Sequence, residues 1–224
     1  MGNAVDRPNI QLQLSEFAEA GLGGVHIIPI YGVRGFEDKF LPFLSEDWMA
    51  MVRYTMQEAR RLDLGVDLTL GTGWPFGGPW ITPRYAAKKL VTSDFSSLEV
   101  EPTRQLVKRA APGGEGWVLD YFDEGSVRHY LHHFDSVFSH TAYPVHPRAF
   151  YHDSYEVYGA DWSTGLPAAF QQQHGYDLLE HLSVLGDPAH PDHPLVKHDV
   201  RATLAELLYS EFTRTWTDWS TERG

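Results

Sequence analysis

The chain has 224 residues, of which 42% are hydrophobic and 13% aromatic, enough for one large domain or for part of a larger protein. This composition excludes a disordered chain, and a net charge of −12 argues against nucleic acid or an anionic membrane surface as a partner. The absence of cysteine excludes disulfides, thiolate metal sites and a cysteine nucleophile. No apolar run approaches the ~20 residues of a membrane span, and the N-terminus lacks the pattern of a signal peptide.

The first 70 residues alternate between predicted helices and strands. A helix is expected to begin at Asp6 and to end at Gly21, which suits a C-terminal cap. The apolar run 25–31 then predicts a strand buried on both faces. Ser45 is expected to cap a helix that reaches Leu62, and a strand at 65–70 follows it directly. This order is typical of a parallel α/β fold.

The second part of the chain interrupts this alternation and then resumes it. Residues 81–118 are expected to form an inserted segment with short strands near Leu90 and Val100. A helix capped by Ser126 and a strand over 149–157 follow, and two further helices are predicted after Pro167 and Val196. The pattern predicts an α/β fold, a partial (β/α)₈ barrel of about half the usual size, spanning 1–224 as one unit. A doubly wound sheet is the alternative.

The loop Gly71–Trp80, directly after a predicted strand, is the first candidate for a binding site. Its four glycines and two prolines exclude a helix, and it carries Trp74, Phe76 and Trp80. An aromatic loop at the end of a buried strand is typical of a pocket wall, and Trp74 is the expected ligand contact. The alternative is a rigid loop whose aromatic side chains fill the core.

Glu156 is the strongest catalytic candidate because it lies at a predicted strand end among aromatic residues. Partial burial there is expected to raise its pKa, which suits a general acid. The alternative is a structural carboxylate paired with Arg34 or Arg148. Strand periodicity places His152 with Glu156 on one face. The expected substrate-binding residues are Trp74, Tyr31, His152, Asp153, Tyr155 and Trp162.

Other polar residues are assigned structural roles. Asp67 and His26 are expected to be hydrogen-bonded inside the fold. The adjacent pair His132–His133 points in two directions on a helix, and His190 and His193 lack a third ligand nearby. No metal site is therefore predicted from the residues themselves.

Four stretches together resemble the catalytic domain of glycoside hydrolase family 106, the α-L-rhamnosidases. They read GLGGVHIIPIYG, LSEDWMAMVRYTMQEARRLDLGVDLTLGTGWPFGGPW, FYHDSYEVYGADW and WTDWSTERG, and the likeness extends over nearly the whole chain. The resemblance implies a (β/α)₈ barrel and inverting hydrolysis of terminal α-L-rhamnosides of plant or microbial polysaccharides. It also implies calcium as an aid in some members, and it places Glu156 on an essential acidic position.

The same resemblance places a second catalytic glutamate beyond Gly224. The chain is therefore expected to be a fragment that depends on the rest of its parent chain, which we expect to be secreted or periplasmic. Inverting hydrolysis needs two carboxyl groups ~6.5–9.5 Å apart, so the isolated residues are expected to be inactive or poorly folded. The alternatives are a related barrel glycosidase of β-galactosidase type and a non-catalytic carbohydrate-binding fragment.

Overall fold

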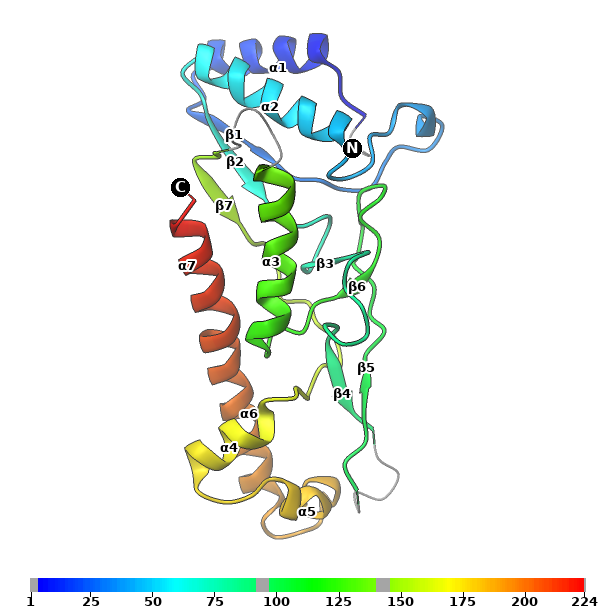
Figure 1. Ribbon diagram of the computed structural model, residues 1–224, viewed down its shortest axis with the longest axis vertical. Coiled ribbons are helices and arrows are strands. Elements are labelled where there is room, and N and C mark those ends of the chain that lie inside the picture. The colour runs from blue at the N-terminus through cyan, green and yellow to red at the C-terminus, as the bar shows by residue number, and fades with distance from the viewer. Residues whose placement is uncertain (1–3, 92–96, 140–145, 224) are drawn as a thin grey trace.

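The protein has a mixed α/β fold built round a small, open parallel sheet (Figure 1). The computed structural model describes residues 4–91, 97–139 and 146–223. The sheet contains β1 (Gly24–Ile27), β2 (Gly65–Thr69) and β7 (Ala149–Tyr151), with β2 in the centre. Both pairs are parallel, so all three strands end at the same edge.

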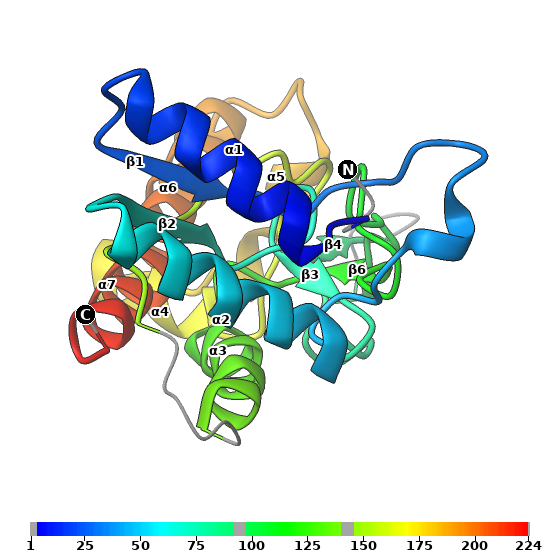
Figure 2. The ribbon, with the colours of Figure 1, turned by 90° about the horizontal axis from the view of Figure 1, so that it is seen from above.

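One face of this sheet is covered by helices and is apolar. Helices α1 (Arg7–Glu19) and α2 (Glu46–Arg61) pack over β1 and β2, as Figure 2 shows from above, and a 3₁₀ turn η1 (Glu37–Lys39) lies between β1 and α2. Helix α3 (Glu124–Ser139) packs on the same side, beside β7. The apolar side chains on this face are those of Val25, Ile27, Val66, Leu68 and Phe150.

The opposite face of the sheet is polar and largely exposed. His26, Asp67 and Tyr151 lie on it, with His26 and Tyr151 in edge-to-face contact at 4.9 Å between ring centroids. The Arg148 guanidinium donates two hydrogen bonds to the Asp67 carboxylate, at 2.9 and 2.6 Å. Arg148 also passes so close to Gly65 that a Cβ there would meet its Nη1 at 2.6 Å. A doubly wound sheet would bury both faces, whereas the described helices cover one.

The inserted segment contributes strands to two small antiparallel pairs. β3 (Gly77–Gly78) pairs with β6 (Trp117–Val118), and β4 (Lys88–Leu90) pairs with β5 (Val100–Pro102). A buried ion pair holds the segment to the core, because Asp120 is inaccessible to solvent and accepts from Lys88 Nζ at 2.9 Å. Ser163 donates a further hydrogen bond to the same carboxylate oxygen.

The C-terminal part forms a helical lobe with its own hydrophobic cluster. It contains α4 (Leu166–His174), η2 (Leu179–His181), α5 (Leu182–Gly186) and α6 (His193–Leu207). Helix α6 continues through a π-helical stretch, η3 (Leu208–Arg214), into α7 (Thr215–Thr221), which returns to the sheet (Figure 1). Residues of α6 pack in the lobe, whereas Phe212 and Trp219 pack in the main core. No helix in the described ranges is both long and apolar enough to cross a membrane.

Three local predictions need correction. β1 stops at Ile27 instead of Tyr31, and it is not buried on both faces, because it is an edge strand that leaves His26 and Ile28 exposed. β7 is three residues long, since the chain after Tyr151 leaves the sheet. Helix α3 is capped by Asp123 instead of Ser126, because the Asp123 carboxylate accepts from the Ser126 backbone N–H at 2.8 Å. The caps predicted at Asp6 and Ser45 are confirmed.

Candidate active site

The loops that follow β1, β2 and β7 meet at the carboxyl edge of the sheet, where parallel α/β proteins place their ligands. Residues 105–111, in the second half of the inserted segment, lie across the same edge. Its backbone is joined to the first two loops, since the Tyr31 N–H donates to the Arg109 carbonyl at 3.0 Å. The backbone groups of Trp74 and Lys108 bond each other in both directions, at 3.1 and 2.9 Å. The inserted segment is therefore part of the candidate site.

Gly73 makes this close approach possible. Its φ of +61° is a left-handed conformation that glycine adopts without strain. A Cβ at this position would lie 2.0 Å from the Lys108 carbonyl oxygen, so no side chain fits. The Gly73 N–H donates to the Pro29 carbonyl at 2.8 Å. This glycine thus joins the β1 loop, the β2 loop and the inserted segment.

Arg109 lies between two of the predicted substrate-binding residues. Its guanidinium carbon is 5.4 Å from the centre of the Tyr31 ring and 5.7 Å from the centre of the Trp74 ring. Both distances are within the range of cation–π attraction. Tyr31 is 39% exposed, and Trp74 is half-buried. The three side chains form a shelf of two aromatic rings and one cation, open to solvent.

Glu156 is ion-paired, with Lys108 Nζ at 2.6 Å from its Oε2 atom. The Tyr158 hydroxyl donates to the same oxygen at 3.2 Å. Hydrogen bonding to Lys108 lowers the pKa of Glu156, and the same bond raises the pKa of Lys108. The expected raised pKa of Glu156 is therefore wrong in this structure, because an ammonium contact outweighs burial. The alternative named the wrong partner, since Glu156 pairs with Lys108 and not with Arg34 or Arg148, and Arg148 pairs with Asp67.

The backbone around Glu156 is fixed by Gln105. Its side-chain amide donates to the Glu156 carbonyl and accepts from the Tyr158 N–H at 2.6 Å. The Ser154 hydroxyl accepts from the Glu156 N–H at 3.1 Å. These bonds replace the ladder that a longer β7 would have supplied, and they hold the Glu156 carboxylate toward Lys108.

His152 lies below this surface in an aromatic cluster. Its ring is 4.3 Å from the Phe76 ring centroid and 4.9 Å from that of Phe212, and its Nε2 atom lies 3.2 Å from the Tyr121 hydroxyl oxygen. Burial lowers the pKa of His152 to about 4, so the ring is neutral near pH 7. The Tyr121 hydroxyl also accepts from the Phe76 N–H at 2.6 Å, and the Tyr155 ring centroid lies 4.5 Å from that of His152.

The remaining predicted contacts separate into exposed and buried groups. Asp153 and Tyr155 are exposed beside Glu156 in the chain, and Tyr155 keeps 47% of its surface accessible. Trp162 is 2% exposed and packs in the C-terminal lobe, apart from the shelf of Tyr31, Trp74 and Arg109. In the aromatic loop, Phe76 is 2% exposed and Trp80 stacks on His133 at 4.0 Å. Phe76 and Trp80 therefore fill the core, and of the three aromatic residues in this loop Trp74 is the one that can face a ligand.

Asp67 and His26 lie farther down the open face. His26 Nε2 is 2.8 Å from the Thr69 hydroxyl, as expected for a hydrogen-bonded histidine, although His26 is exposed and not interior. Hydrogen bonding to Arg148 lowers the pKa of Asp67, while burial lowers the pKa of His26.

The side chains of the described ranges do not form a calcium site. They contain no cluster of three or more His, Asp or Glu side chains able to hold a metal ion. Calcium requires 6–8 oxygen ligands, so these residues do not fit the ion and no step is assigned to it.

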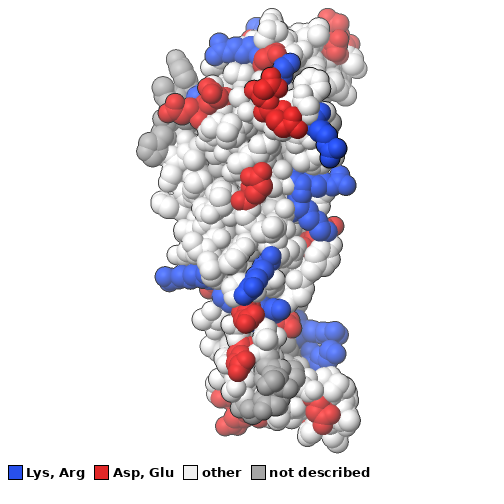
Figure 3. Space-filling view, turned by 90° about the vertical axis from the view of Figure 1, so that its right-hand side faces the viewer, with Lys and Arg blue, Asp and Glu red and all other residues white. Residues whose placement is uncertain are grey.

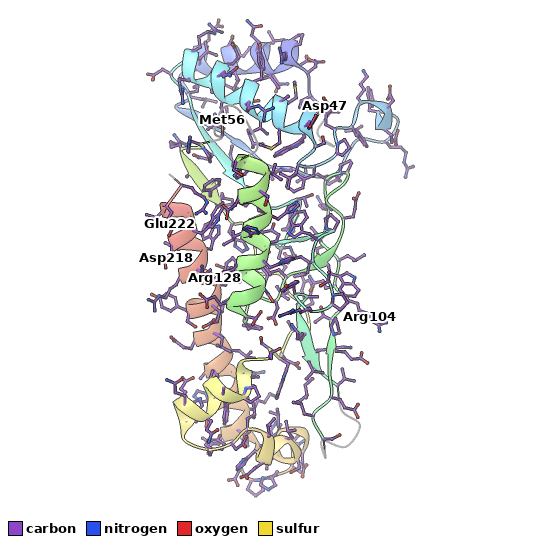
Figure 4. All side chains as sticks on the ribbon, viewed as in Figure 1. Asp47, Met56, Arg104, Arg128, Asp218 and Glu222 are labelled. Atoms are coloured by element: carbon purple, nitrogen blue, oxygen red, sulfur yellow. The ribbon has the colours of Figure 1, made fainter. Side chains whose placement is uncertain are left out.

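Two pockets lie away from the strand-end edge. One of about 540 Å³ is bounded by α3 and α7, where Figure 4 labels Arg128, Asp218 and Glu222. Arg128 is ion-paired with Glu124 at 2.6 Å. The other, of about 300 Å³, lies between β4 and α6. Figure 3, which shows the side of the molecule to the right in Figure 1, has charges of both signs round a broad uncharged middle.

The family model for glycoside hydrolase family 106, described as alpha-L-rhamnosidase, matches residues 1–106 and 98–224. The chain belongs to glycoside hydrolase family 106. This membership confirms the resemblance drawn from the sequence motifs. A rhamnosidase structure from Novosphingobium sp. PP1Y aligns with 100% of this family 106 chain at a TM-score of 0.75 and 15% identity. The family 106 chain covers 44% of that rhamnosidase.

One curated relative shares a shorter region with the family 106 chain. A putative beta-glucuronidase of Formosa agariphila is 38% identical over 62 residues, which are 27% of this chain and 5% of the relative. The family 106 chain thus spans less than half of each of these two proteins.

Sequence reasoning missed Gln105, Lys108 and Arg109, which hold or flank the candidate carboxylate. They lie in the segment taken for a peripheral insertion. One signal in the sequence could have found them. Three of the 18 lysines and arginines of the chain fall within six residues, at Arg104, Lys108 and Arg109.

Proposed function

We propose that this chain forms the N-terminal half of a (β/α)₈ glycosidase barrel that hydrolyses terminal α-L-rhamnosides, with Glu156 as one of two catalytic carboxylates. The observation that carries the proposal is Glu156 at the carboxyl edge of a parallel sheet, in a family 106 chain, beside the shelf of Tyr31 and Trp74. An aromatic face suits the C–H face of a sugar ring, and a carboxylate at a strand end suits glycoside cleavage.

The shape of the sheet supports a barrel in preference to a doubly wound fold. Its helices cover one face, while the polar residues His26, Asp67 and Tyr151 lie on the other. In a barrel these side chains would line the interior, and additional strands would pair with β1 and β7. In this proposal the inserted segment, about residues 81–118, contributes Lys108 and Arg109 to the rim.

Lys108 constrains the part that Glu156 can play. A general acid must carry the proton that it donates to the leaving oxygen, and the ion pair keeps Glu156 ionised. Glu156 can therefore activate water with the ion pair in place, or protonate the leaving oxygen only after Lys108 withdraws. The second carboxylate is proposed to come from outside the 224 residues, ~6.5–9.5 Å from Glu156.

Hydrolysis of an aryl α-L-rhamnoside tests the proposal directly. The longer parent protein is expected to release the aryl alcohol, and its Glu156→Gln variant is expected to lose at least ~10³-fold in kcat, since removal of a catalytic carboxylate removes acid–base catalysis. The 224-residue chain alone is expected to show no turnover. Full activity of Glu156→Gln would refute the catalytic assignment, and robust turnover by the 224 residues would refute the need for a second carboxylate from elsewhere.

A β-glycosidase activity is the second candidate, supported by the 38% identity to the putative beta-glucuronidase. The β-galactosidase-like alternative belongs to the same class. A panel of aryl glycosides separates them, because a rhamnosidase cleaves the α-L-rhamnoside and leaves the β-D-glucuronide and β-D-galactoside intact. A purely carbohydrate-binding chain would bind sugar equally well with and without Glu156→Gln.

A further inference from the structure

We propose that the pocket between α6 and the β4–β5 hairpin binds a small aromatic carboxylate. The pocket is lined by residues other than those of the strand-end site and has a volume of about 300 Å³, at the lower end of the range for small-molecule sites. Such a volume takes a single small molecule and excludes a protein helix.

The inner lining of the pocket is apolar and comes from four separate segments. Leu90 lies on β4, Leu185 on α5, and Val200 and Leu204 on α6, while Trp162 belongs to the connection after β7. Trp162 and Val200 are 2% and 7% exposed, so they form a fixed floor and not a flexible surface. Apolar walls that converge from several elements favour a ligand with a rigid hydrophobic body.

The rim of the pocket carries two cations, Lys197 and Arg201. They lie four residues apart on α6, so they are neighbours on one helix face. Within the described ranges neither forms an ion pair or a hydrogen bond through its side chain. Two cations at the mouth of a pocket with apolar walls favour a ligand that joins an anionic group to a hydrophobic body.

The position of Asp161 sets the orientation of the ligand. Its carboxylate also lines the pocket and is held to β4, because it accepts from the Leu90 N–H at 2.8 Å. An anion would be repelled there and attracted to the α6 rim, so the ligand carboxylate lies against Lys197 and Arg201 and its ring lies on Trp162 and Leu204. His193 fills the remaining edge, with Nδ1 held by the Val184 carbonyl at 3.1 Å.

The test compares 1-naphthoate with its neutral counterpart 1-naphthamide, using calorimetric titration of the 224-residue chain. Naphthoate is expected to bind saturably, and naphthamide at least ~10-fold more weakly, because the amide keeps the ring but loses the charge. The Lys197→Gln/Arg201→Gln variant is expected to bind naphthoate at least ~10-fold more weakly than the wild type.

Two further variants complete the experiment. Arg214→Gln removes an exposed arginine from the same continuous helix outside the pocket, and it is expected to leave naphthoate affinity unchanged. Leu204→Glu places a carboxylate in the apolar wall and is expected to abolish binding. Circular dichroism confirms that each variant folds. Equal affinity for the acid and the amide, no saturable binding, or unchanged binding in the double variant would overturn the proposal.

Discussion

Lys108 determines the charge of Glu156, the residue on which the proposed chemistry depends. Their ion pair of 2.6 Å lies on the surface, with 44% and 41% of the two side chains exposed. Such a pair contributes little to folding, since solvent screens it. Its effect on protonation is larger, because the ammonium stabilises only the ionised carboxylate.

Replacing Lys108 with methionine is expected to raise the pKa of Glu156 toward the ordinary value of a glutamate. The hydrogen bond to Lys108 is the largest cause of the present lowering, and methionine removes it while keeping an unbranched side chain. A ¹³C NMR titration of the Glu156 carboxyl carbon measures the change. Lys39→Met, which removes an exposed lysine elsewhere, is expected to leave that pKa unchanged. No change in Lys108→Met would show that the ion pair is absent in solution.

At the scale of elements, Gly73 connects three loops that sequence distance would keep apart. Gly73→Ala is expected to destabilise the protein by two separate effects. Its left-handed φ costs about 1–2 kcal/mol for a residue with a Cβ. The clash with the Lys108 carbonyl adds roughly 1–3 kcal/mol, the usual cost of overpacking.

Gly159→Ala is the matched control for this variant. Gly159 has a similar φ of +67°, but a Cβ there meets nothing within 4 Å. Gly159→Ala is therefore expected to lose only the free energy of unfolding that the left-handed backbone conformation costs. Urea unfolding of the two variants gives the difference, and equal losses would contradict the close approach of residues 73 and 108.

The helices were predictable because their signals are local. Asp6 and Ser45 bond the N–H groups three residues along, as their sequence positions indicate. The cap at Asp123 was not predicted, because Ser126 is also a residue type that often caps helices. The two could be told apart only from the structure, in which Ser126 is buried in the core. The length of β7 was overestimated, since burial continues to alternate from His152 to Glu156 after the ladder has ended.

The candidate site was less predictable, because its charges meet through tertiary contacts. Glu156 and Lys108 are 48 residues apart, and no pattern in the sequence pairs them. Tyr31 and Trp74 were named from their strand-end positions, but the cation between them was not. Trp162 carried the same local signal as Trp74, and only the C-terminal lobe shows that it is buried.

At the scale of the whole molecule, His152 lies where the sheet, the aromatic loop and the C-terminal helix meet. Its ring contacts Phe76, Phe212 and Trp216, and only the neutral ring suits these surroundings. Protonation of His152 at low pH is therefore expected to weaken the packing between the sheet, the aromatic loop and the C-terminal helix.

We expect the free energy of unfolding to fall as the pH drops from about 6.5 to about 4. The pKa of His152 is lowered to about 4 in the folded protein, whereas the unfolded chain binds the proton near 6.5. The difference corresponds to roughly 3 kcal/mol, present above pH 6.5 and lost by pH 4. Urea unfolding across this range measures it, and His152→Gln is expected to flatten the dependence by that amount. His132→Gln, at a side chain 80% exposed, should leave it unaltered.

The long C-terminal helix has a further consequence through its π-helical stretch. One residue more than an α-helical repeat, accommodated in Leu208–Arg214, rotates all that follows by about 100° relative to an unbroken helix. Val200 can thus face the lobe, while Trp219 faces the sheet and donates to Asp135 at 3.0 Å. The π-helical stretch changes which side of the helix faces the core, so that one continuous helix can pack in both hydrophobic clusters. Deleting a single residue there would bring both halves into the same phase and turn Trp219 away from the core.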